Sequence, residues 1–156
     1  MYFCNAITLN YISMCQTTII SHNIVKLGTR SYKHSLEALV PNEYGIKQLR
    51  SLNRDLDSFY VFLYSQCNSI TEHDYHVFGK QLISMLGALK MLYTSCKQMT
   101  KEASMSIEVE KLKKNYSALK ELSNDIQNYK VKAPKDQEWS SLLSDASLAL
   151  KNIAHD

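Results

Sequence analysis

Glycine and proline are scarce in this chain of 156 residues, which contains 4 glycines and 2 prolines. All-β folds need many tight turns and use both residues freely, so this composition argues against a sheet protein. A chain of this length fits one domain with a sizeable core. The 4 cysteines are scattered without a C-x-x-C pair, a pattern that favours buried, reduced thiols in a reducing compartment.

Long apolar runs and a strong net charge are also missing. No run of about 18 apolar residues predicts a membrane span. The segment before Lys26 has no lysine or arginine and is interrupted by polar residues, so it does not make a signal peptide. We therefore expect a cytoplasmic protein without a membrane partner. A net charge of +3 is also weaker than a dedicated nucleic-acid-binding domain usually carries.

Motifs that carry catalysis are absent as well. The sequence has no G-x-S-x-G, no P-loop and no G-x-G-x-x-G, which are the patterns of nucleophilic hydrolases, nucleotide hydrolases and dinucleotide-binding enzymes. We therefore expect no catalytic residue and no cofactor, and we do not expect an enzyme.

The longest regular pattern runs from Tyr75 to Ala103, where apolar residues recur at alternating steps of 3 and 4. This a/d spacing of a heptad predicts one long helix with a single apolar seam. Positions beside the seam, such as Ile83 and Met91, are apolar too, so we expect the most buried helix of a globular bundle. Gly87 costs about 1 kcal/mol relative to alanine in a helix, and close approach of a neighbouring helix would compensate. The seam consists of Tyr75, Phe78, Leu82, Met85, Leu89, Leu92, Cys96, Met99 and Ala103.

Helical spacing elsewhere predicts an all-α fold, an antiparallel up-and-down helical bundle of four long helices plus an N-terminal helix. Short connections between long helices favour antiparallel neighbours. Within the N-terminal segment 1–40 we expect a helix over 6–26 that Gly28 ends, and then a short helix over 31–40. We treat residues 1–156 as one domain with a four-helix core over 43–154. The expected core helices are 43–67, 72–102, 106–131 and 136–154.

Asn53 is the one polar residue in the apolar seam expected over 43–67. A buried asparagine at such a position can fix helix register. Polar residues more commonly lie at a solvated edge, and we expect that placement here.

Charge is uneven between the last two expected helices. Residues 105–135 carry seven lysines against four acids, whereas residues 136–156 carry four acids against one lysine. Antiparallel packing of these two helices would place opposite charges together. We expect Trp139 to be the large apolar anchor at one end of the last helix.

The densest polar cluster is Glu72, His73, Asp74 and His76, at the start of the central helix. His73 and His76 are three residues apart, so both imidazoles can lie near one helix face. Together with Asp74 or Glu72 they are weak candidates for zinc or another divalent ion. The alternative is a solvated cluster, because acidic residues favour helix N-termini. A bundle di-iron site is disfavoured, since it needs E-x-x-H pairs and none occurs.

The stretch after His76 resembles the phosphorylated helix of histidine phosphotransfer domains, which are four-helix bundles. In that family the phosphorylated histidine stands in the pattern H-x-x-K-G, whereas this chain reads H-x-x-G-K through Gly79 and Lys80. The resemblance covers about 20 residues and implies that His76, or its neighbour His73, could accept a phosphoryl group.

A basic stripe on the helix expected over 106–131 could contact phosphates, which would give affinity for nucleic acid without sequence specificity. Acidic residues are interleaved with it, so a solvated helix face is favoured. The lysines of the stripe are Lys111, Lys113, Lys114 and Lys120. The interleaved acids are Glu108, Glu110, Glu121 and Asp125.

These patterns together favour a non-catalytic helical-bundle protein that acts through protein–protein interaction, as an adaptor, scaffold or regulator. A homodimer is plausible, because the apolar residues exceed what one face needs and would otherwise be exposed. The alternatives are a small metal-binding or histidine-phosphotransfer-like protein using His73 and His76, and weak nucleic-acid binding through the Lys111–Lys120 face.

Overall fold

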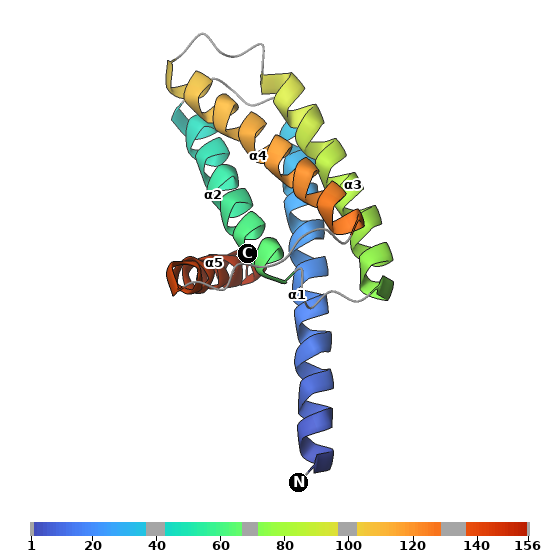
Figure 1. Ribbon diagram of the computed structural model, residues 1–156. Helices are drawn as coiled ribbons and strands as arrows, with labels where there is room; N and C mark the ends of the chain where they lie inside the picture. Colours follow the sequence, from blue (N-terminus) through green and yellow to red (C-terminus); the bar gives the residue numbers. More distant parts are fainter. Residues whose placement is uncertain (1, 37–42, 67–71, 97–102, 129–136, 156) are drawn as a thin grey trace.

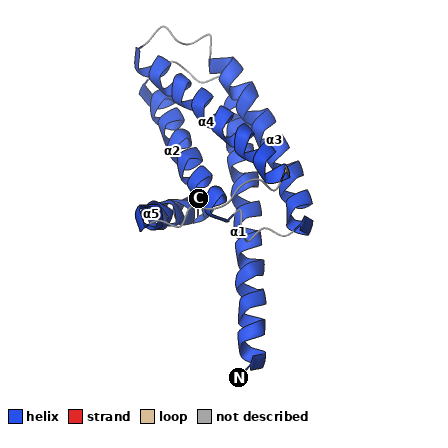
Figure 2. Ribbon diagram, viewed as in Figure 1, coloured by secondary structure: helices blue, strands red, loops and turns tan. Residues whose placement is uncertain are grey.

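The structure is a computed structural model that describes residues 2–36, 43–66, 72–96, 103–128 and 137–155. These residues are helical except for Asn128, and none of them lies in a strand (Figure 2). The predicted all-α class is therefore confirmed. The predicted helical positions 37–40, 67, 97–102, 129–131 and 136 lie outside the described residues. The helices are α1 (Tyr2–Leu36), α2 (Glu43–Gln66), α3 (Glu72–Cys96), α4 (Ala103–Gln127) and α5 (Gln137–His155).

The first four helices form an up-and-down bundle in which successive helices reverse direction (Figure 1). The all-α bundle predicted from the short connections is therefore confirmed. Its four up-and-down helices are α1 to α4, however, whereas the four-helix core was expected over 43–154. Around it the described helices pack as α1 on α3, α3 on α4, α4 on α2 and α2 on α1. In consequence α1 and α3 run parallel to each other, and so do α2 and α4. The interface between α1 and α3 is the most extensive of these.

The core lies along the predicted apolar seams. The six seam residues of α3 that the structure describes are all buried, and each large side chain of this kind contributes about 1.5–3 kcal/mol through burial. Leu112 and Leu119 of α4 and Leu56 and Phe59 of α2 meet them in one continuous cluster. The buried seam residues of α3 are Phe78, Leu82, Met85, Leu89, Leu92 and Cys96.

The predicted break at Gly28 is wrong, because α1 is one helix of 35 residues. Ile20, Ile24 and Leu27 are almost completely buried, and this packing outweighs the poor helix propensity of the segment. A Cβ atom at Gly28 would lie 3.5 Å from the Met85 Cα atom. Gly28 therefore lets α1 lie close to α3 instead of ending the helix. The N-terminal part of α1 extends past the other helices (Figure 1).

The predicted pairing of the last two helices is also wrong. Within the described residues α5 packs on α2 and α1 and shares no comparable interface with α4, and it lies across the end of α2 (Figure 1). Trp139 does anchor the helix, since its ring meets that of Tyr64 edge-on with centroids 5.4 Å apart. Aromatic packing thus outweighs surface charge pairs, which contribute only a few tenths of a kcal/mol each. On α5, Leu142 is 49% exposed, whereas Ala146 is buried.

The burial expected for the apolar positions beside the α3 seam is wrong for Ile83 and Met91. Ile83 is 61% exposed and Met91 is 49% exposed, because α3 packs mainly on α1 and α4 and leaves its outer side open. Apolar residues in the middle of α3 therefore serve two purposes. Some fill the core, and others line the surface beside α1.

Candidate functional site

A shallow groove of about 490 Å³ runs along the outer surface where α1 and α3 lie side by side. Its floor consists mostly of small residues, and Tyr32 and Met91 provide larger side chains. We call this surface the α1–α3 groove. It is lined by Gly28, Thr29 and Tyr32 from α1 and by Ser84, Gly87, Ala88 and Met91 from α3.

Gly87 is exposed at the floor of the α1–α3 groove. A Cβ atom at this position would meet no heavy atom within 4 Å, whereas one at Gly28 would contact Met85. The prediction that a neighbouring helix of the same chain compensates for Gly87 is therefore wrong among the described residues. The close approach of two helices at a glycine occurs instead at Gly28 of α1, which lies against Met85 of α3.

Exposed apolar side chains flank the α1–α3 groove. Val25 and Tyr32 on α1 are 52% and 49% exposed, and Ile83 and Met91 on α3 are 61% and 49% exposed. Single exposed apolar residues are ordinary on protein surfaces, but these four lie on adjoining faces of two packed helices. Such a grouping is typical of an interaction surface.

The relative position of α1 and α3 is fixed by a polar contact as well as by apolar packing. The Ser21 hydroxyl and the Gln81 amide are paired, with Gln81 Nε2 2.8 Å from Ser21 Oγ. This contact is only partly buried, and Ser21 lies about two turns before Gly28 along α1. The two walls of the groove are therefore held in register before any ligand binds.

A second polar feature lies between α2 and α4, and it overturns the expectation for Asn53. Asn53 is 3% exposed. Its Nδ2 atom donates to the main-chain oxygen and to Oε2 of Glu108, both at 3.0 Å. Its Oδ1 atom accepts from Nδ2 of Asn115 at 3.2 Å. Asn53 therefore fixes the register of α2 against α4, which is the use of a buried asparagine that the seam also allowed.

Glu108 is the charged centre of this α2–α4 polar cluster. Its Oε1 atom lies 3.2 Å from Nε of Arg50 and 3.6 Å from Nζ of Lys111. Burial alone would raise the pKa of Glu108, but hydrogen bonds from Asn53 and Arg50 and the charge of Lys111 outweigh it and lower that pKa. A carboxylate so fully partnered stays ionised and is unsuited to proton transfer near neutral pH.

Asp57 is coupled to the same cluster. Desolvation raises the pKa of Asp57, although the charge of Lys111 and a hydrogen bond from Asn115 act in the opposite direction. In the described part of the chain, the partners of the Glu108 carboxylate are Arg50, Asn53 and Lys111, and none of them is a nucleophile. We therefore interpret the cluster as a structural element that positions α2 and α4.

Of the predicted metal or phosphate-accepting residues, only Asp74 has a described side chain, and it is partly buried. The side chains of Glu72, His73 and His76 lie outside what the structure describes, although all four positions belong to α3. In the described part of the chain, no group of three His, Cys, Asp or Glu residues could hold a metal ion. The metal and phosphotransfer hypotheses therefore stay predictions.

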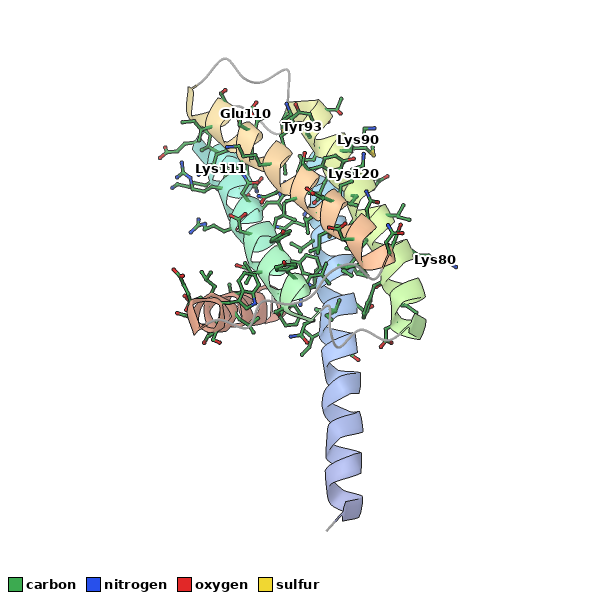
Figure 3. The ribbon with its side chains drawn as sticks, in the orientation of Figure 1. Lys80, Lys90, Tyr93, Glu110, Lys111 and Lys120 are labelled. Atoms are coloured by element: carbon green, nitrogen blue, oxygen red, sulfur yellow. The ribbon has the colours of Figure 1, made fainter. Side chains whose placement is uncertain are left out.

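The four lysines of the predicted basic stripe are all exposed on α4, but they do not form one surface. Lys111 meets Glu108 of the same helix at 3.6 Å, and its charge also acts on Asp57 of α2. Lys120, nine residues later, lies farther along the helix (Figure 3). Helical spacing puts Lys114 on the same face as Lys111, and Lys113 on the same face as Lys120. The nucleic-acid hypothesis stays a prediction.

The fold is an all-α helical bundle, and the α1–α3 groove lies on its outer surface. No family model matches the chain, and comparison with curated proteins and with solved structures finds no significant match. In the described residues, no helix combines the length and the apolar character that crossing a membrane requires. Because a bundle supports many functions, function has to be argued from the groove itself.

Proposed function

We propose that this protein is a non-catalytic interaction protein that binds an amphipathic helix of a protein partner in the α1–α3 groove. The observation that carries the proposal is Gly87. A glycine inside a helix costs about 1 kcal/mol relative to alanine, and the described fold gains no packing from it, because nothing lies within 4 Å of the Cβ position. Close approach of a ligand backbone is a use that requires glycine.

The shape and chemistry of the α1–α3 groove support a helix as the ligand. An amphipathic helix places an apolar side chain on one face at every third or fourth residue, and it binds in shallow apolar grooves through these side chains. Val25, Tyr32, Ile83 and Met91 offer exposed apolar area on both sides of the groove. The glycine, serine and alanine side chains of its floor would let the two backbones approach each other closely.

A selection experiment tests this function without knowledge of the natural partner. A displayed library of helical peptides with leucine, isoleucine or alanine on one face is selected against the full chain. We expect enriched peptides that bind the wild type and lose at least tenfold in affinity for Gly87→Leu, which fills the groove. The control variant Ser117→Leu adds the same side chain at an exposed position of α4 and should bind normally.

Circular dichroism first establishes that Gly87→Leu is folded, as expected for an exposed helical position. The proposal is wrong if no peptide is enriched, or if the enriched peptides bind Gly87→Leu as tightly as they bind the wild type.

A further inference from the structure

The surface around the α1–α3 groove carries charge of one sign only. No aspartate or glutamate occurs in α1, and none occurs in α3 from Tyr75 to Cys96. Three lysines on the outer sides of these helices are exposed, namely Lys33 on α1 and Lys80 and Lys90 on α3. Figure 3 shows Lys80 extending away from the bundle. The groove therefore has a floor of mostly small residues, and we call Lys33, Lys80 and Lys90 its basic rim.

Other described surfaces of the bundle mix the two signs. On α4, the exposed residues Glu110 and Glu121 alternate with Lys113 and Lys120. An acid-free surface next to exposed apolar residues selects for a ligand that is both apolar and acidic, because complementary charge steers association and like charge opposes it.

The chain itself contains a helix with these properties. The exposed side of α5 presents two leucines and two acids at helical spacing, so that they share one face. Leu142 is 49% exposed and Leu148 is 64% exposed, and Glu138 and Asp145 are exposed as well. We call Glu138, Leu142, Asp145 and Leu148 the α5 stripe.

Within one molecule the α5 stripe does not reach the α1–α3 groove. α5 packs on α2 and on α1, and it shares no comparable interface with α3 among the described residues. The α5 stripe lies on the side of α5 that these contacts leave exposed. Contact between the two surfaces therefore requires a second molecule.

We propose that the α1–α3 groove binds the α5 stripe of a second copy of this chain. This inference rests on the function proposed above and names the ligand. Leu142 and Leu148 would lie on the small residues around Gly87, while Glu138 and Asp145 would face the lysine rim. A symmetric contact of groove against groove is disfavoured, because it would place lysines opposite lysines. The contact is thus between two different surfaces, so it builds open chains or rings.

Mixing two assembly-deficient variants tests this contact. Gly87→Leu has a filled groove and an intact α5 stripe, whereas Leu142→Asp/Leu148→Asp has an intact groove and an altered stripe. We expect each variant alone to remain a monomer of 17.9 kDa in light scattering. An equimolar mixture should reach about twice that mass, because one contact forms and neither partner can extend it. The wild type should grow in mass with concentration, and less so at high salt.

Ile107→Asp is the matched control, since Ile107 is 57% exposed on α4 and belongs to neither surface. It should assemble as the wild type does. The inference is wrong if the mixture stays monomeric, or if either variant alone forms dimers. If the mixture stays monomeric while selected peptides still bind the wild-type groove, the ligand is a helix of another protein and the proposed function stands. If both assays fail, the proposed function fails as well.

Discussion

Replacement of Asn53 by leucine should destabilise the protein, although it puts an apolar residue into an apolar seam. Asn53 is 3% exposed and donates to the Glu108 carboxylate at 3.0 Å. A hydrogen bond to a charged group contributes about 1.5–3 kcal/mol, and the bond from Asn115 adds about 1 kcal/mol. The larger apolar area of leucine returns about 1 kcal/mol. We expect a net loss of about 1.5–3 kcal/mol.

Urea denaturation followed by circular dichroism at neutral pH measures this loss. With a slope of about 1.5–2 kcal/mol per molar urea for a chain of this size, the midpoint should fall by about 0.75–2 M. Asn124→Leu is the control, because Asn124 is exposed on α4 and such a surface change should stay within about 0.5 kcal/mol.

A double-mutant cycle with Glu108→Leu separates the polar contact from general packing. Removing one partner leaves a buried charge without its donor, whereas removing both leaves an apolar pair. The two changes should therefore be coupled by at least about 1 kcal/mol. An Asn53→Leu variant as stable as the wild type, or a coupling energy near zero, would refute the role assigned to the α2–α4 polar cluster.

Three further predictions concern the core and its titrating groups. The pKa of Glu108 is lowered in the folded state. Its contribution to the free energy of unfolding is therefore complete above its unfolded pKa of about 4.3 and is lost as the pH falls through the folded value. In urea denaturation at several pH values, Glu108→Gln should lose less stability in acid than the wild type does, and an equal loss of stability would contradict this. Burial raises the pKa of the Cys96 thiol to about 11. In a variant whose only cysteine is Cys96, a thiol reagent at pH 8 should therefore react only when the protein unfolds. Rapid labelling of the folded chain would contradict the burial of Cys96. Leu89 is completely buried, so Leu89→Asp should abolish the cooperative thermal transition; a folded variant that lost only self-association would mean that the α3 seam is an interface.

Local periodicity predicted much of the fold. The α3 seam from Phe78 to Cys96 follows from spacing alone, and every one of its described residues is buried. The continuity of α1 did not follow, because Gly28 and the β-branched residues around it favour a break locally. Their packing against α3, including the contact of Gly28 with Met85, becomes visible only in three dimensions.

The candidate site was harder to predict than the core. Ile83 and Met91 are apolar, and sequence does not distinguish an apolar residue of the core from one at a binding surface. The buried position of Asn53 depends on Glu108, 55 residues away, and no local pattern indicates that pairing. One available signal was missed. The absence of acidic residues from α1 and from most of α3 can be seen in the sequence, and it indicates the basic rim of the groove.

The central claim is that the α1–α3 groove binds the α5 stripe of a second copy of this chain, and the methyl group of Met91 reports on this contact directly. The Leu142→Asp/Leu148→Asp variant is labelled with ¹³C-methyl methionine and observed by NMR. An excess of the unlabelled Gly87→Leu variant is then added to it. We expect the Met91 resonance to shift, because Met91 lines the groove, while buried Met85 and Met105 change little. An unchanged Met91 resonance at saturating partner would contradict the claim.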